Sequence, residues 1–263
     1  MGISFVVVYY GNTGSSWLME TLSTTKEVLV PGFEPLEAWA WKVSDAEKLA
    51  WVRAALQPPT QRWGEPFDRW VAELAASPQF QEIVGWKRDN FKVLGFKMST
   101  SAVADSTALI EVVAEAGARL VALRRDDRLR HALSLYRYHE ERRSQFAGSE
   151  PGGPSRVRLR RFQRWVDESI RLDEGLKTFQ RLAVEQLGTE RVLPVGYEEF
   201  VTSHGKQATI DRLAQFLALD RGLIKEAASF VKATPDDLSE AVANYQALRR
   251  RYRSTPLARS FDP

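Results

Sequence analysis

The feature that most constrains the fold lies near the amino terminus, where the apolar run "ISFVVVYY" leads directly into "GNTGSSWLMETL". The apolar run predicts a buried strand, and the residues after the small polar loop predict a helix. A Gly-rich turn from a strand into a helix presents several backbone N–H groups and the positive end of the helix dipole. The loop is therefore suited to a phosphate or a sulfate group.

Three further apolar runs predict buried strands: "FKVLGFKM" (91–98), "ARLVALR" (118–124) and "RVLPVGY" (191–197). A helix is predicted in "SDAEKLAWVRAAL", where Ser44 and Glu47 form a capping-box pattern. Other predicted helices span 66–76, 104–116, 127–142, 157–187 and 206–218. Strands that alternate with helices imply a parallel sheet covered on both faces. The prediction is thus an α/β fold with three layers, a central parallel sheet and a P-loop-like start.

The length of 263 residues and an apolar content of 44% are compatible with one packed domain. We predict a single domain over 1–263, with a helical insertion at about 35–90. The Gly-, Pro- and Ser-rich stretch "FAGSEPGGPSR" (146–156) predicts a flexible surface loop. The sequence contains no internal repeat and does not predict an oligomeric state.

The composition excludes several classes of function. The net charge of +3 is too small to predict bulk nucleic-acid binding. With no cysteine and three scattered histidines, neither disulfides nor a metal site is predicted. The apolar start lacks a basic segment and is only about six residues long, so we expect no signal peptide, no membrane span and a cytoplasmic location.

The first loop does not fit an ordinary nucleoside triphosphatase. Ser15 and Ser16 follow Gly14, so the Lys of a Walker A loop, which serves the β- and γ-phosphates, is missing. Taken alone, the loop is also compatible with a plain tight turn in which Thr13 or Ser15 caps the helix.

A second polar stretch, "LVALRRDDRLRHALSLYRY" (120–138), follows another predicted strand. Arg125 leaves the end of that strand, and Ser134 lies nine positions later in the next helix. A guanidinium and a hydroxyl together suit a phosphomonoester. The alternative is a solvated basic face of a helix.

Together these stretches resemble the two nucleotide-binding motifs of the sulfotransferases that use 3′-phosphoadenosine 5′-phosphosulfate (PAPS). In that superfamily the first loop has the form Ser/Thr-Gly-Ser/Thr-Ser/Thr-Trp-Leu, and "TGSSWL" matches it at every position. The stretch "RRDDRLRHALS" resembles the second motif, and "VGYEEFV" resembles a strand-end Tyr-Glu-Asp/Glu-Leu segment. "NYQALRRRYRSTP" is similar to a basic tail segment of bacterial members.

The resemblance implies a set of donor-binding residues. The 5′-phosphosulfate would lie against the loop formed by Asn12, Thr13, Gly14, Ser15 and Ser16. Trp17 and Tyr197 would contact adenine, and Arg125 and Ser134 would hold the 3′-phosphate. For Trp17 and Tyr197, ordinary core packing is the alternative.

The chain departs from the family pattern at two positions. Many members carry Lys or Arg before the Ser/Thr-Gly of the first loop, but Asn12 stands here, and Lys97 is the expected replacement for that charge. Ser99 stands where cytosolic members have a catalytic His. We interpret His131, His139 and His204 as surface or helix-packing residues.

The stretch "VPGFEPLEAW" resembles the Glu-Pro-Leu segment of the carbohydrate-sulfating branch. This likeness favours Glu34 as the general base that accepts the proton of an acceptor hydroxyl. Glu37, three residues later, is the second candidate. Alternatively, Glu34 simply precedes a helix that begins with Pro35.

The predicted reaction transfers a sulfuryl group from PAPS to a hydroxyl of a carbohydrate, a lipid or a phenolic or alcohol metabolite, without a metal. Six tryptophans between 39 and 86 are compatible with an aromatic-lined acceptor site or with an ordinary core. Two alternatives stay open: a P-loop-type kinase, and a non-catalytic protein that binds PAPS or a polyanion. The basic cluster "RVRLRRFQR" (156–164) predicts a solvated helix face or a lid over an anionic site.

Overall fold

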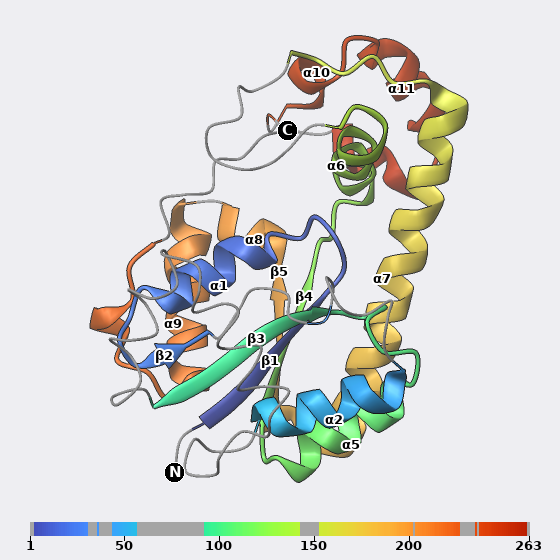
Figure 1. Ribbon diagram of the computed structural model, residues 1–263. Helices are drawn as coiled ribbons and strands as arrows, with labels where there is room; N and C mark the ends of the chain where they lie inside the picture. The colour runs from blue at the N-terminus through green and yellow to red at the C-terminus, as the bar shows by residue number, and fades with distance from the viewer. Residues whose placement is uncertain are drawn as a thin grey trace.

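A computed structural model describes residues 3–30, 36, 44–56, 92–142, 153–201, 203–226, 235 and 237–261. Within these residues the chain forms a five-stranded sheet, with every neighbouring pair parallel, in the order β2-β3-β1-β4-β5 (Figure 1). The strands are β1 (Ile3–Tyr9), β2 (Val28–Leu29), β3 (Val93–Ser99), β4 (Arg119–Arg124) and β5 (Val192–Gly196). The four longer strands confirm the predicted ones. β2 was not predicted, because two residues are too short to show a pattern.

The helices alternate with the strands, as predicted. They are α1 (Ser15–Ser23), α2 (Asp45–Leu56), α5 (Ser106–Glu115), α6 (Arg128–Glu140), α7 (Leu159–Leu187), α8 (Tyr197–Val201), α9 (Ser203–Leu217), α10 (Leu238–Ala241) and α11 (Tyr245–Tyr252), with short 3₁₀ turns η1 (Thr189–Arg191), η2 (Arg221–Leu223) and η3 (Pro256–Phe261). The capping box of α2 is present, since Ser44 N–H donates to Glu47 Oε2 at 2.8 Å. The helix predicted at 66–76 lies outside the described residues.

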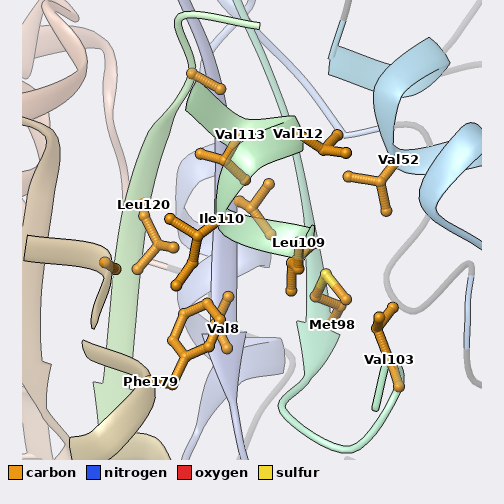
Figure 2. Packing of buried hydrophobic residues seen from close by; sticks show 14 of the residues in the cluster. Val8, Val52, Met98, Val103, Leu109, Ile110, Val112, Val113, Leu120 and Phe179 are labelled. Carbon is orange, nitrogen blue, oxygen red and sulfur yellow. The ribbon is translucent and has the colours of Figure 1, made fainter. Parts of the chain in front are cut away.

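The two faces of the sheet bury two separate apolar clusters. Because side chains alternate along a strand, Val6 and Val8 of β1 face α2, α5 and α7, whereas Phe5 and Val7 face α1, α8 and α9. Figure 2 shows Val8 on the first face among Ile110 of α5 and other apolar side chains. This arrangement confirms the three-layer α/β/α fold.

A third apolar cluster joins α6, the start of α7 and the carboxyl-terminal segment, which comprises α10, α11 and η3 (Figure 1). A parallel bridge between Ser155 and Val242 adds to this contact. Ser155 belongs to the predicted loop 146–156, of which only 153–156 are described, and it is buried. Of the predicted insertion 35–90, Leu36 and 44–56 are described; its assignment as an insertion, and the single domain over 1–263, stay predictions.

The connections place a site at one edge of the sheet. After β1 the chain passes to the face covered by α1, whereas after β3 and β4 it passes to the opposite face, through α5 and through α6 and α7. In open parallel sheets, ligands bind at such a switch point, outside the carboxyl ends of the strands. A functional site is therefore expected at the carboxyl ends of β1, β3 and β4.

Candidate functional site

The loop between β1 and α1 has a backbone that requires glycine. Gly14 has φ +78°, and a Cβ added to it would lie 2.8 Å from a ring carbon of Phe200. Asn12 also has a positive φ of 62°. Gly14 is the N-cap of α1 and makes no side-chain capping bond, so the alternative of a cap by Thr13 or Ser15 is wrong.

Three carbonyl groups of this loop accept hydrogen bonds from the protein itself. The hydroxyl of Thr13 donates to Tyr10 O at 2.9 Å, and Arg125 Nη1 donates to Asn12 O at 3.3 Å. His131 Nε2 lies 2.7 Å from Gly11 O. In a trans peptide the C=O and the following N–H point in opposite directions, and the described chain has no cis peptide. The donors thus fix which way the loop N–H groups face.

Lys97 lies inside β3, next to β1, where it is in register with Val7. Its side chain is buried, and Nζ donates to Ser16 Oγ at 2.7 Å and to Ser15 Oγ at 3.4 Å. The structure therefore brings Lys97 to the first turn of α1, beside the loop, as predicted from the sequence. Its catalytic role stays a prediction.

Arg125 directly follows β4 and is buried at 5% exposure. Its backbone is fixed on both sides by the hydroxyl of Tyr10, which accepts from Arg125 N at 2.9 Å and donates to Arg125 O at 3.0 Å. Its guanidinium lies 4.3 Å from the centre of the Tyr197 ring, and its Nε has no hydrogen-bond partner among the described residues. A guanidinium is thus held rigidly beside the loop with donor capacity left over.

A buried network of charged and polar groups supports this arrangement. Arg128 Nη1 donates to the Tyr10 hydroxyl at 2.6 Å, and Arg128 Nη2 lies 2.5 Å from Asp173 Oδ1 of α7. Burial raises the pKa of Tyr10, although Arg128 opposes the shift. The Glu198 carboxylate accepts the N–H groups of Asp126 and Asp127, at 2.9 Å each, and so fixes the turn after Arg125.

Three supports of the site were not predicted from the sequence: Tyr10, Glu198 and Asp173. Tyr10 ends an apolar run and reads as a core residue, and no local pattern connects Asp173 to the loop. Glu198 had a usable signal, because it follows Tyr197 in the segment "YEEF".

The two predicted adenine contacts both pack against Phe200. The Trp17 ring stacks on Phe200 with centroids 4.9 Å apart and planes 4° from parallel, and the Tyr197 ring meets Phe200 edge-on at 5.3 Å. Trp17 is 8% exposed and belongs to the cluster under α1. The core-packing interpretation thus describes part of its role, and adenine contact stays a prediction for both residues.

Ser134 and His131 occupy the same helix, α6. Both are buried. Residues three positions apart share a face of a helix, so Ser134 lies on the face from which His131 reaches the loop. Binding of a 3′-phosphate by Ser134 and Arg125 stays a prediction.

The three histidines differ in surroundings. His131 is fully buried, and burial together with the nearby Arg125 lowers its pKa to about 3. It does not merely pack against a helix, because both ring nitrogens have polar partners. His139 is exposed and stacks on Trp165 at 4.6 Å, in agreement with a surface role. The side chain of His204 lies outside the described residues.

The two candidate bases, Glu34 and Glu37, also lie outside the described residues, as do five of the six tryptophans between 39 and 86. The sixth, Trp51, packs edge-on against Phe96 in the core. In the basic cluster 156–164, every arginine side chain is exposed, and Arg161 pairs with Glu140.

In the described part of the chain, no group of acidic, His or Cys side chains is arranged to hold a metal ion. None of the helices described is both long and apolar enough to cross a bilayer.

No protein-family model matches this sequence. No curated protein matches it either. Several solved structures do. The sulfotransferase domain of the olefin synthase from Synechococcus PCC 7002 aligns with a TM-score of 0.50 and 15% identity, over 97% of this chain and 88% of that one. This likeness shows that the chain has the fold of a sulfotransferase domain.

Two other structures give lower scores. A sulfotransferase from Alicyclobacillus acidocaldarius aligns at a TM-score of 0.49 and 14% identity, over 99% of this chain and 94% of that one. Mouse sulfotransferase SULT7A1, in a structure complexed with PAP, aligns at a TM-score of 0.41 and 14% identity, over 83% of this chain and 60% of that one.

Proposed function

We propose that this protein is a sulfotransferase that transfers the sulfuryl group of PAPS to a hydroxyl of an acceptor and releases adenosine 3′,5′-bisphosphate. One observation carries the proposal: the buried ammonium of Lys97 lies 2.7 Å from Ser16 Oγ, at the uncapped N-terminus of α1. A buried cation and the positive end of a helix dipole at one point favour an anion. The sulfotransferase fold and the loop sequence "TGSSWL" support the same choice.

The residues around the loop fit the 5′-phosphosulfate. The N–H groups and hydroxyls at Gly14, Ser15 and Ser16 are donors that suit its oxygens. Lys97 would stabilise the negative charge that develops on the leaving phosphate, and it would replace the basic residue that the family has at the position of Asn12. Because this ammonium is fixed before the donor arrives, little reorganisation accompanies the reaction.

The residues at the end of β4 fit the 3′-phosphate. Tyr10 binds the backbone of Arg125, and the Tyr197 ring packs against its guanidinium. Because Nε has no hydrogen-bond partner among the described residues, the guanidinium keeps donor capacity for a phosphate. Ser134 would add a hydroxyl donor. Recognition of the 3′-phosphate would separate PAPS from ATP.

The acceptor is a hydroxyl of a carbohydrate, a lipid or a phenolic or alcohol metabolite. Its oxygen forms the new bond to sulfur as the bond between sulfur and the bridging phosphate oxygen breaks, and its proton passes to a carboxylate. We assign that role to Glu34, with Glu37 as the alternative. The matched variants Glu34→Gln and Glu37→Gln separate them, since only loss of the base removes the acid limb of the pH–rate profile.

Calorimetry with adenosine 3′,5′-bisphosphate, adenosine 5′-monophosphate and ATP with Mg²⁺ tests the donor site, and incubation with [³⁵S]PAPS and a panel of hydroxyl acceptors tests transfer. We expect the bisphosphate to bind most tightly and radiolabel to appear in an acceptor. Preference for ATP with Mg²⁺ would favour a kinase, and tight bisphosphate binding without transfer to any acceptor would favour a non-catalytic binding protein.

A further inference from the structure

We infer that His131 is a positioning residue that sets the orientation of the Gly11–Asn12 peptide and couples the loop of residues 11–14 to α7. The assignment of this loop to an anion rests on the proposed function. The role of His131 in shaping the loop rests on the geometry of the protein alone.

His131 bridges two segments that are distant in the sequence. Its Nε2 lies 2.7 Å from Gly11 O, and its Nδ1 lies 2.7 Å from Ser169 Oγ in α7. The imidazole is fully buried, and its ring meets the Tyr10 ring edge-on at 5.0 Å. Neither ring nitrogen faces water, so the imidazole has one fixed set of partners.

These partners determine the tautomer. A carbonyl oxygen can only accept, so Nε2 carries the proton and donates to Gly11 O. Nδ1 is then an acceptor, and the Ser169 hydroxyl donates to it. The charged groups that act on the ring, Arg125 and Arg128, are both cationic and oppose a second proton. The imidazole is therefore a neutral bridge with a single direction of donation.

The bridge has a consequence for the loop N–H groups. Since His131 holds Gly11 O on its own side, the N–H of Asn12 must point to the opposite side of that peptide plane. Arg125 acts in the same way one peptide later, through Asn12 O. Ser169 lies on α7, whose Leu176 and Phe179 are in the central core, so the loop is anchored to a rigid element. His131 thus fixes the direction of the donors that an anion would meet.

Two substitutions of similar size separate this role from simple packing. In His131→Gln the amide nitrogen can take the place of Nε2 and donate to Gly11 O. In His131→Asn the shorter amide can take the place of Nδ1 and meet Ser169, but it does not reach Gly11. Both variants remove the ring and, with it, the edge-on contact with Tyr10.

The first measurement is hydrogen exchange at the amides of residues 12–15 in the nucleotide-free protein. We expect the amides at these sites to exchange at least about tenfold faster in His131→Asn than in His131→Gln. The unfolding temperatures of the two variants should be equal, so that the difference reports the loop alone. Calorimetry should show the same order, with the dissociation constant for adenosine 3′,5′-bisphosphate about tenfold higher in His131→Asn. Nitrogen-15 NMR of the wild-type imidazole should show a neutral ring protonated at Nε2 from pH 6 to 8.

Equal loop exchange in the two variants, or a ring protonated at Nδ1, would overturn the role of His131. If the wild-type protein binds no bisphosphate, the proposed function fails, but loop exchange and the NMR tautomer still decide the role of this histidine. Should both variants fold poorly, the Ser169→Ala variant provides the comparison: it removes the hydroxyl that joins the imidazole to α7, and loop exchange should rise above that of the wild type. Unchanged loop exchange in Ser169→Ala would also overturn the inference.

Discussion

The helices α1 and α6 begin at the same edge of the sheet but in opposite electrostatic surroundings. At the start of α6, Asp127 accepts the N–H of Arg130 at 2.9 Å, so a carboxylate meets the positive end of the helix. At the start of α1 the N-cap is Gly14, without a side-chain cap, and the buried Lys97 ammonium contacts the first two residues. One helix start is compensated by the protein, and the other combines two sources of positive potential.

This difference distinguishes the proposed ligand site from a structural helix start. A carboxylate near a helix N-terminus stabilises the helix, whereas a buried cation there adds to the positive potential of the helix end. Arg125, also buried and next to the same loop, adds to the positive potential. The α1 end is therefore the expected ligand site, and the α6 end is a structural element that holds Arg125 and His131 in place.

The first prediction concerns the cation at the start of α1. Lys97→Met should lower kcat by roughly 10²- to 10³-fold with a much smaller change in the KM for PAPS, because in the proposed reaction the charge would act mainly on the leaving phosphate. The free energy of unfolding of the ligand-free protein should rise by about 1 kcal/mol, since the repulsion between the ammonium and the positive end of α1 is removed.

Steady-state kinetics and urea denaturation measure the two effects of Lys97→Met. Lys92→Met is the matched control, because Lys92 lies just before the same strand but its side chain is 67% exposed. It should leave kcat unchanged. Turnover of Lys97→Met within about twofold of the wild type would show that this charge contributes little to the transition state.

The second prediction concerns the guanidinium between the two helix starts. Arg125→Ala should weaken the binding of adenosine 3′,5′-bisphosphate by roughly 30- to 1,000-fold, or about 2 to 4 kcal/mol, because the proposed charge-assisted contact with the 3′-phosphate would be lost. Adenosine 5′-monophosphate, which lacks the 3′-phosphate, should lose little affinity. Ser134→Ala should shift the same ratio in the same direction by a smaller factor. Equal losses for both nucleotides in calorimetry would contradict the assignment.

Local patterns predicted much of this molecule, and long-range contacts explain what they missed. The four longer strands and the helices between them follow from apolar periodicity and capping residues, which are local. Lys97 could be placed near the loop because carboxyl ends of parallel strands meet at one edge of a sheet. The bond between His131 and Gly11, 120 positions apart, and the pairing of Arg128 with Asp173 depend on tertiary packing, which no short pattern encodes.

The third prediction concerns His131, which lies in the first turn of α6 and contacts Gly11 O in the loop before α1. The pKa of His131 is lowered from 6.5 to about 3 in the folded protein. Between these values the unfolded chain binds a proton that the folded chain excludes, so the free energy of unfolding falls as the pH falls, by up to about 1.4 kcal/mol per pH unit. Above pH 6.5 this loss is absent.

Urea denaturation of the wild type and of His131→Gln at several pH values isolates this contribution. Carboxylates that titrate near pH 4 affect both proteins alike, so the difference between the two curves reports His131. We expect the wild type to lose stability more steeply than His131→Gln as the pH falls from 6 to 5. Parallel curves over that interval would show that the imidazole accepts a proton in the folded state.

The last prediction concerns the start of α5, which a carboxylate caps. Asp105 is the N-cap of α5, and its carboxylate accepts the N–H groups of Thr107 and Ala108 at 2.9 and 3.0 Å. Asp105→Ala should lower the free energy of unfolding by about 1 kcal/mol, because a compensated helix start loses its cap. Bisphosphate affinity and kcat should not change, since the Asp105 carboxylate bonds to the backbone of α5 itself. If Asp105→Ala loses stability and Lys97→Met gains it, the native side chain stabilises the start of α5 but destabilises the start of α1. Stability losses in both variants would instead mean that the buried cation is part of what holds α1 in place.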